Sequence, residues 1–283
     1  MTTATTATTP TTEALAPTMT TVAAIQMVST PDLAHNIARA RALVAQAAAL
    51  GATLVSLPEY WPVMGMHERD KIGMAEQVGH GPIQAFMMAA AREHGIWLIG
   101  GTLPLASGDC TRVMNTTLVY NPDGESVARY DKIHLFGFNR GDEAYDEART
   151  IAPGGAVASF EAPFGRVGLS VCYDLRFPEL YRMMGTCALI VVPAAFTDTT
   201  GRAHWEVLLR ARAIENQCYV LAAAQGGLHR NGRHTFGHSM LVDPWGEVLD
   251  VLEQGEGVIK GVLDTAYLAS VRESLPALKH RRL

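Results

Sequence analysis

Three reactive side chains follow directly after apolar segments that the sequence predicts to be strands: Glu59, Lys132 and Cys172. In α/β sheets, ligands bind and catalytic side chains gather at the ends of strands. A carboxylate, an ammonium and a thiol at one such edge supply the groups for acyl transfer: the thiol attacks a carbonyl, the carboxylate moves protons and the ammonium stabilises the oxyanion. Each residue alone is more commonly a loop charge, a surface lysine or a core cysteine. Their shared position after three strands favours a catalytic role.

The segment around Cys172 predicts how the thiol is placed. Residues 167–171 form a short apolar run bounded by glycine, which is typical of a buried strand. Pro178 followed by Glu179 is a helix start. Cys172 is therefore expected in a tight turn between a strand and a helix, where nearby N–H groups favour a thiolate. The alternative interpretation is a small buried hydrophobic residue.

Strands and helices are expected to alternate along the chain. Predicted strands cover residues 22–28, 53–57, 96–102, 116–120, 126–130, 167–171, 188–192, 219–224 and 258–263, with a hairpin over 239–251. Predicted helices include residues 82–94 and about 203–217, the latter after a loop F-T-D-T-T-G-R. Because each half also contains a hairpin, the sheets must be mixed. The sequence predicts a single α/β domain over residues 21–283, after a disordered Thr/Ala/Pro-rich tail over residues 1–20.

Composition argues against several other classes of function. Of 283 residues, 48% are hydrophobic and 18% charged, and the net charge of −5 provides no basic surface for nucleic acid. No apolar run approaches the roughly 20 residues that span a bilayer, so no membrane partner is expected. The tail resembles neither a transit peptide nor a secretory signal. Four separated cysteines without a C-x-x-C pair (Cys110, Cys172, Cys187 and Cys218) are typical of reduced thiols in a cytoplasmic protein.

No cofactor or metal is expected from the motifs. His229, His234 and His238 lie in a loop rich in Gly and Arg, with no carboxylate or thiol near them in sequence, so a metal site is disfavoured. The phosphate-binding pattern G-x-x-x-x-G-K-[ST] does not occur. The segment His204-Trp205-Glu206 is interpreted as the start of a packed helix rather than as catalytic material.

Three separated motifs carry a resemblance to a known family. The segments L-P-E-Y, D-K-I-H-L-F and V-C-Y-D-L-R-F-P-E-L resemble the signature segments of the nitrilase superfamily of carbon–nitrogen hydrolases, and the resemblance extends from about Val22 to Arg282. It implies a four-layer α-β-β-α sandwich whose subunits pair through their helical layers into a homodimer or a larger homo-oligomer.

The resemblance also implies roles for the site residues. Cys172 would be the nucleophile, Glu59 the general base and acid, and Lys132 the oxyanion stabiliser, with the backbone N–H of Tyr173 as a second oxyanion donor. The intermediate would be a thioester on the cysteine. A binding protein that keeps the sandwich without the chemistry is the alternative from another functional class.

The family has a second glutamate, shortly before a Pro-Gly pair. In this sequence the segment Y-D-E-A-R-T-I-A-P-G places it at Glu147, with Glu143 as a competitor whose distance from Pro153-Gly154 fits less well. Its expected role is to orient Lys132 and a water, because a buried lysine without a counter-charge tends to lose its proton.

Within the superfamily, Tyr173-Asp174 after the cysteine disfavours nitrile hydrolysis, since true nitrilases typically show Trp-Glu there. Residues 203–225 and 237–246 and the segment L-P-A-L-K-H-R-R resemble the Nit amidases, and among them the deaminated glutathione amidases. That resemblance implies hydrolysis of a small anionic α-keto amide, deaminated glutathione, to α-ketoglutarate and cysteinylglycine as metabolite repair. The alternative enzyme is ω-amidase, which acts on α-ketoglutaramate and α-ketosuccinamate.

An anionic substrate needs fixed cations near the nucleophile. Arg176, four residues beyond Cys172, is a candidate for gripping a substrate carboxylate bidentately. The equally weighted alternative is that it anchors the turn through Asp174 or Glu179. Phe196 and Thr199 are weaker candidates for the substrate pocket.

Overall fold

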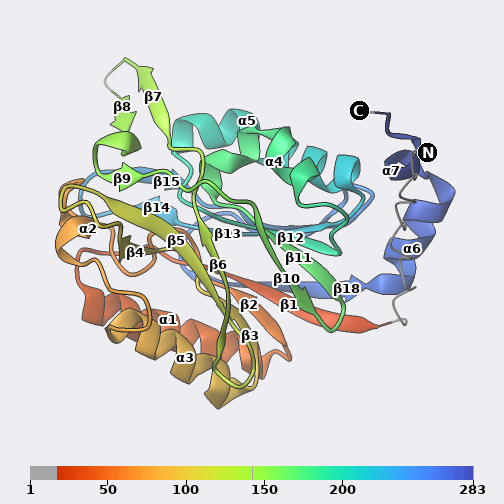
Figure 1. Ribbon diagram of the computed structural model, residues 1–283, viewed down its shortest axis with the longest axis horizontal. Coiled ribbons are helices and arrows are strands. Elements are labelled where there is room, and N and C mark those ends of the chain that lie inside the picture. Colours follow the sequence, from red (N-terminus) through yellow and green to blue (C-terminus); the bar gives the residue numbers. More distant parts are fainter. Residues whose placement is uncertain (1–17, 142, 283) are drawn as a thin grey trace, which may run out of the picture.

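The computed structural model describes residues 18–141 and 143–282. The tail was expected over residues 1–20, and residues 1–17 of it lie outside the described residues. Met19 and Thr20 already belong to the first strand, where they pair with Asp264 and Leu263 from the last strand. Segments near the two ends of the chain therefore lie side by side (Figure 1).

The described part of the chain forms two larger sheets, of which the first has eight strands. Their order is β18-β1-β2-β3-β5-β4, and β6 and β9 also pair with β5. The strands are β1 (Met19–Gln26), β2 (Leu54–Ser56), β3 (Trp97–Ile99), β4 (Leu103–Ala106), β5 (Val113–Tyr120), β6 (Ser126–Asp131), β9 (Ile151–Ala152) and β18 (Gly257–Asp264). β1, β2 and β3 are parallel, whereas β18 runs antiparallel to β1 and β5 runs antiparallel to β3, so the sheet is mixed as expected.

The second sheet has six strands in the described residues, in the order β10-β11-β12-β13-β16-β17. They are β10 (Ala158–Ala162), β11 (Gly165–Leu169), β12 (Leu189–Ala194), β13 (Tyr219–Ala224), β16 (Ser239–Val242) and β17 (Val248–Leu252). The central strands β11, β12 and β13 are parallel. Two separate hairpins pair β7 (Gly137–Arg140) with β8 (Glu143–Asp146) and β14 (Gly226–Leu228) with β15 (His234–Phe236).

Helices cover the outer faces of the two sheets. Figure 1 shows α1 (Leu33–Ala49) and α3 (Pro82–His94) beneath the first sheet, and α4 (Pro178–Met183) and α5 (Asp198–Asn216) above the second. Shorter elements are α2 (Asp70–Gly73), α6 (Thr265–Ser274), α7 (Ala277–His280) and the 3₁₀ helices η1 (Glu147–Arg149) and η2 (Cys172–Arg176).

The alternation of side chains along β1 explains why the layers stack. Val22 and Ala24 pack in the core that also contains Leu169 of the second sheet, whereas Ala23 and Ile25 pack in the core beneath, with α1 and α3. Successive strand residues point to opposite faces, so a strand that is apolar on both faces must be covered twice. These contacts give the four layers of an α-β-β-α sandwich, which confirms the expected fold.

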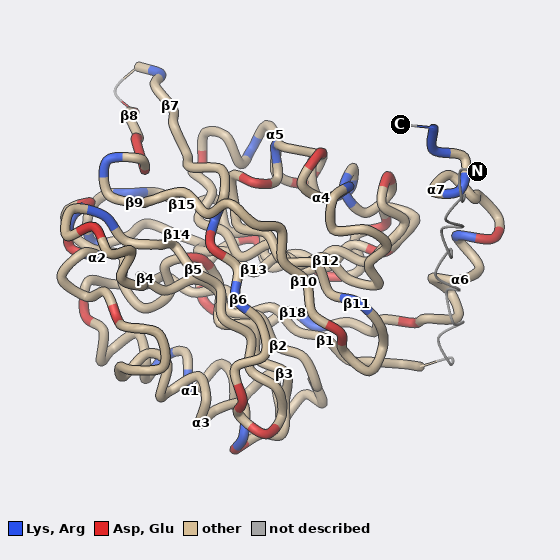
Figure 2. The backbone as a smooth tube through the Cα atoms, viewed as in Figure 1, with Lys and Arg blue, Asp and Glu red and all other residues tan. Residues whose placement is uncertain are grey.

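Charge follows the same layering. Figure 2 shows Lys, Arg, Asp and Glu along the helices and loops, while β1, β12 and β13 carry none of them. Uncharged central strands fit burial between layers. Residues of both signs are interspersed over the outer elements of the described chain.

Most predicted strands differ from the observed ones by one to three residues at an end, and two expectations differ more. Helix α5 begins at Asp198, five residues earlier than expected, because the Thr197 hydroxyl accepts a hydrogen bond from the backbone N–H of Thr200 and caps the helix. The expected loop between β13 and β16 contains the β14–β15 hairpin. By contrast, α3 and β13 have the expected bounds, and Asp264 caps α6 as expected.

Candidate active site

Strand ends from both sheets bring four sequence-predicted residues together. Glu59 follows β2 and Lys132 follows β6 in the first sheet, whereas Cys172 follows β11 in the second. Glu147 begins η1, after the β7–β8 hairpin. All four residues are buried, and three of them are linked by ion pairs. The candidate site therefore lies between the two halves of the fold.

Lys132 is the centre of this cluster. Its Nζ lies 2.9 Å from Glu59 Oε1 and 2.8 Å from Glu147 Oε2. Burial disfavours the ammonium, but the charges of Glu147 and Glu59 outweigh it and raise the pKa of Lys132. Because an ammonium has three donors and two are used by these carboxylates, one N–H remains without a hydrogen-bond acceptor among residues 18–141 and 143–282.

The carboxylate of Glu59 is held by donors that sequence reasoning missed. Besides Lys132, the side-chain amide of Asn115 donates a 2.9 Å hydrogen bond to Glu59 Oε1, and the backbone N–H of Ala195 donates a 2.9 Å bond to Oε2. Asn115 lies inside β5, and Ala195 directly follows β12. These bonds fix the orientation of the carboxylate from both sheets.

Glu147, rather than Glu143, is the second glutamate at this site. It accepts a 2.7 Å hydrogen bond from the Tyr60 hydroxyl and another of 2.7 Å from the backbone N–H of Phe136. Burial disfavours its charge, yet the Lys132 ammonium and these donors lower the pKa of Glu147, whereas burial and Glu147 raise the pKa of Tyr60. Glu143 lies in β8, where it pairs in register with Arg140 in the hairpin.

Cys172 begins η2 with a backbone φ of 51°, in the left-handed region. Non-glycine residues are rarely held there, and such turns cluster at functional sites. The helix N–H groups favour a thiolate, but burial and then the Glu59 charge raise the pKa of the thiol, although Lys132 opposes them. A turn of only five residues provides too little positive potential to outweigh a buried carboxylate. The raised pKa favours the protonated thiol.

Asp174 fixes the turn that carries the thiol. Its Oδ2 accepts a 2.9 Å bond from the backbone N–H of Val171 and a 2.7 Å bond from the Tyr130 hydroxyl. Its Oδ1 accepts from the backbone N–H of His134 and lies 2.7 Å from the ring Nδ1. Tyr130 and His134 flank Lys132 in sequence, so one buried carboxylate ties the lysine segment to the thiol turn.

A small pocket opens beside the thiol. It is lined by Phe136, Cys172, Tyr173, Ala195, Phe196, Thr197 and Thr200. Phe196 therefore lies where it was expected, whereas Thr199 does not line the pocket, because the helical turn starting at Asp198 places Thr197 and Thr200 there instead. As the second residue of η2, Tyr173 has one of the N–H groups that a helix start leaves without an intrahelical acceptor.

Arg176 lies at the edge of the same pocket. Its guanidinium carbon is 5.7 Å from the centre of the Tyr173 ring and 5.5 Å from that of Phe196. Its Nη1 is 3.3 Å from His204 Nδ1. No carboxylate in the described ranges lies within 4.0 Å of Arg176. The arginine therefore does not anchor the turn through Asp174 or Glu179, which was the alternative interpretation.

Other residues singled out from the sequence have structural contacts. Trp205 is buried in α5 and donates from Nε1 to the carbonyl of His238. Arg212 and Glu215 form the expected pair at 2.8 Å. The ring nitrogens of His229 lie near Ser29 O and Thr235 Oγ1. In the part of the chain that the structure describes, no cluster of three metal-ligating side chains occurs and no helix is long and apolar enough to cross a membrane.

Several known proteins are similar to this chain over most of its length. The family model described as carbon-nitrogen hydrolase matches residues 21–273. A deaminated glutathione amidase of Synechocystis is 40% identical over 265 residues, which cover 92% of this chain and 97% of that protein. An omega-amidase of Xenopus laevis is 37% identical over 270 residues, covering 91% of this chain and 93% of that one.

A solved structure has the same fold. The C. elegans NitFhit protein superposes with a TM-score of 0.85 at 38% sequence identity over 93% of this chain. NitFhit is a fusion of a nitrilase and a fragile histidine triad protein, and this chain spans 65% of its length in that structure. The similarity therefore concerns part of the fusion protein.

Proposed function

This chain belongs to the carbon–nitrogen hydrolase family, and from that premise we propose that it is a cysteine amidase that hydrolyses deaminated glutathione to α-ketoglutarate and cysteinylglycine. The observation that supports this most directly is the buried Glu59–Lys132–Glu147 cluster beside the pocket of the Cys172 thiol. Relatives about 40% identical over 92% of the chain carry the name deaminated glutathione amidase.

In the proposed reaction, Glu59 activates the thiol at the moment of attack. The raised pKa of Cys172 means that its proton must be taken by a base, and Glu59 is the carboxylate whose charge acts most strongly on it. Sγ then forms a bond to the amide carbon. Glu59 returns the proton to the leaving nitrogen, the C–N bond breaks, and an acyl thioester remains on Cys172.

Lys132 and Tyr173 stabilise the oxyanion in this scheme. The remaining N–H of Lys132 and the backbone N–H of Tyr173 are the two donors proposed for the tetrahedral oxygen. Glu147 keeps Lys132 charged and oriented, because it is the first of the two counter-charges that raise the pKa of the ammonium. Water activated by Glu59 then hydrolyses the thioester and frees the thiol.

The substrate carries a carboxylate on its acyl side, next to the keto group. We assign this carboxylate to Arg176, whose cation lies over two rings of the pocket wall without a carboxylate partner of its own among the described residues. A guanidinium can bind a carboxylate with two parallel hydrogen bonds. The second candidate function is that of an ω-amidase, because the Xenopus relative has that name and the space beside the thiol is small.

Subunit pairing is part of the proposal. Apolar side chains remain exposed on the helical layer of the second sheet, at Met183 of α4 and at Val207 and Ile214 of α5. A second copy packed on this layer would cover them. Light scattering on the purified protein should give at least twice the 30.5 kDa chain mass, and a monomer would overturn this part.

The substrate assignment is tested by α-ketoglutarate release, which both candidate substrates share as product. We expect kcat/KM for deaminated glutathione to exceed that for α-ketoglutaramate. The reverse order would assign the chain to the ω-amidases without changing the chemistry. A folded protein that cleaves neither, even at high concentration, would favour a silent binding protein.

A further inference from the structure

Arg233 is a half-buried arginine whose guanidinium has few partners. It precedes β15, and its Nη2 donates a 2.9 Å hydrogen bond to the carbonyl of Ala195. Its Nε is buried without any hydrogen-bond partner. No carboxylate of the described residues lies within 4.0 Å of it. Most of its five N–H donors are therefore unused.

A fully buried arginine shows what a structural role looks like in this fold. Arg212 uses Nε and Nη2 on the carbonyl of Leu175 and Nη1 on Glu215. All three of its nitrogens have partners. Because a buried donor without a partner is costly, Arg233 differs from Arg212 in a way that a role in packing does not explain.

The position of Arg233 connects it to the reacting groups. Ala195, whose carbonyl it contacts, donates its N–H to Glu59 and lines the pocket of the Cys172 thiol. On its other side the guanidinium carbon lies 5.2 Å from the centre of the Tyr145 ring, which is 5.5 Å from the ring of Phe136 in the same pocket wall.

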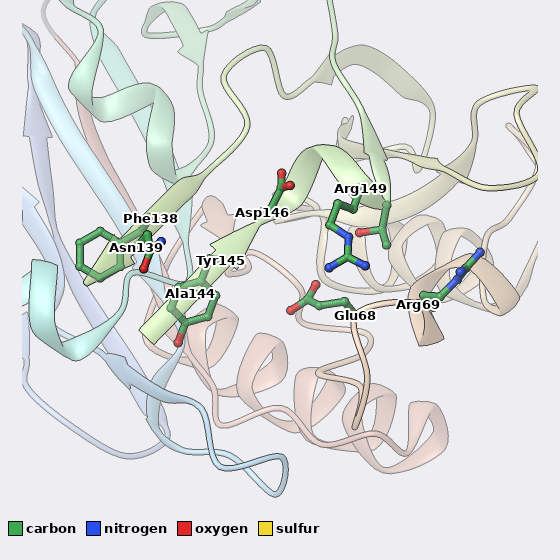
Figure 3. A pocket seen from close by; sticks show the side chains of 9 residues that line it. Glu68, Arg69, Phe138, Asn139, Ala144, Tyr145, Asp146 and Arg149 are labelled. Carbon is green, nitrogen blue, oxygen red and sulfur yellow. The ribbon is translucent and has the colours of Figure 1, made fainter. Parts of the chain in front are cut away.

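Arg233 and Tyr145 also border open space outside the thiol pocket. Arg233 and Tyr60 line one pocket together with Glu68, and Glu68 and Tyr145 line a larger one, shown in Figure 3. Figure 3 shows Tyr145 on its hairpin, with Glu68 and Arg149 beside it. A chain leaving the thiol pocket past Phe136 would therefore meet Tyr145 and Arg233 next.

We propose that Arg233 binds the carboxylate at the far end of the substrate's leaving group, and so selects a peptidyl amide over a primary amide. This inference rests on the proposed function. Deaminated glutathione has one carboxylate on its acyl side and another on its terminal glycine. With Arg176 assigned to the first, we assign Arg233 to the second, because its contact with Ala195 places it beside the thiol pocket, whereas Arg69 and Arg149 line the outer pocket. Two extended residues reach about 7 Å at most, so this carboxylate must be bound close to the thiol pocket.

The test compares deaminated glutathione with an analogue whose terminal carboxylate is converted to a carboxamide. A charged hydrogen bond is worth a factor of about 10 to 100, so the wild type should prefer the acid in kcat/KM by that factor. In Arg233→Gln the ratio of kcat/KM for the acid to that for the carboxamide should fall to about one. Arg233→Lys keeps the charge, and its ratio should lie between those of the wild type and Arg233→Gln. A general defect at Ala195 or Glu59 would lower both rates and leave their ratio unchanged.

Arg230→Gln is the matched control, because Arg230 is exposed in the same loop and loses the same charge. Arg230→Gln should keep the wild-type ratio of kcat/KM for the acid to that for the carboxamide. The proposal is overturned if the wild type does not distinguish the acid from the carboxamide, or if Arg233→Gln keeps the full preference. Failure of the proposed function gives a different result: the wild type would cleave α-ketoglutaramate and neither peptidyl substrate, and both proposals would then be rejected.

Discussion

The hydroxyl of Tyr130 donates a 2.7 Å hydrogen bond to the buried carboxylate of Asp174. This bond joins β6 of the first sheet to the turn that follows β11 of the second. Lys132 lies two residues after Tyr130, and Cys172 lies two residues before Asp174. The relative position of the ammonium and the thiol therefore depends on a contact that neither of them makes.

The first prediction concerns Asp174→Asn. An amide nitrogen cannot accept from the N–H of Val171 or from Tyr130, so a buried donor loses its partner. We expect a loss of about 1–3 kcal/mol in the free energy of unfolding and a fall in kcat at unchanged KM. Urea unfolding and steady-state kinetics would measure both. Asp123→Asn, on an exposed turn, is the control and should alter neither; an active, fully stable Asp174→Asn protein would contradict the positioning role.

The second prediction concerns Lys132→Met. Two buried carboxylates would then lose their common counter-charge, which typically costs about 3–5 kcal/mol, and we expect activity to fall by at least about a hundredfold. In the wild type the pKa of Glu147 is lowered, so its contribution to stability is present above the unfolded carboxyl pKa of about 4.3 and is lost as pH falls below it.

In Lys132→Met the contribution of Glu147 to stability should change with pH in the opposite direction. Burial without the ammonium raises the pKa of Glu147, so the variant should gain stability as pH falls from 7 to 5. The difference in unfolding free energy between wild type and variant should narrow over that range. A difference that stays constant with pH would show that the ion pair does not control the ionisation of Glu147.

The third prediction concerns the alkaline limit of stability. Burial raises the pKa of Cys172 well above its ordinary value and that of Cys187 to about 11. A raised pKa contributes stability that is present below the unfolded thiol pKa of about 8.5 and is lost as pH rises above it. Cys172→Ser should reduce this pH slope by up to about 1.4 kcal/mol per pH unit, the value for one proton. Cys110→Ser, at an exposed thiol, should not, and equal slopes in all three proteins would refute the buried neutral thiol.

The fourth prediction concerns Arg176→Gln. If its guanidinium binds the acyl-side carboxylate, KM for α-ketoglutaramate should rise by about 10- to 100-fold with a smaller change in kcat. Arg202→Gln, on the exposed face of α5, is the matched control. A variant with unchanged KM but lower stability would show that Arg176 is structural.

The strand-end position of the reactive residues was predictable because it depends on chain direction alone. Glu59, Lys132 and Cys172 each follow a strand whose apolar run is visible in the sequence, and the structure brings them together. The donors that hold Glu59 were not predictable in this way. Asn115 lies within a strand, and its amide meets the carboxylate only after both strands are placed, while Ala195 contributes a backbone N–H that no side-chain pattern reveals.

The start of α5 shows another limit. The residues Asp198-Thr-Thr-Gly have the composition of a loop, yet Thr197 caps a helix there. Gly201 is needed in the second turn because a Cβ would collide with the Phe236 ring. That ring comes from the β14–β15 hairpin, far along the chain, so local sequence favours a loop where tertiary packing requires a helix.

The charge state of the thiol was also set by tertiary structure. A position at the start of a helix favours a thiolate, but Glu59 arrives beside it from the other sheet and burial acts in the same direction. The sign of the effect on the pKa of Cys172 therefore depends on a residue over a hundred positions away. The sequence indicated the nucleophile, whereas the burial and the neighbouring carboxylate that raise the pKa of its thiol follow from the tertiary structure.

The most direct test of the account is to trap the acyl-enzyme. The protein is mixed with deaminated glutathione or α-ketoglutaramate, quenched in acid within the first turnover, and its peptides are analysed by mass spectrometry. Either substrate should leave the same α-ketoglutaryl group on the peptide that contains Cys172, and Cys172→Ala should neither carry it nor release product. Turnover by Cys172→Ala, or an acyl group on another residue, would contradict the central claim.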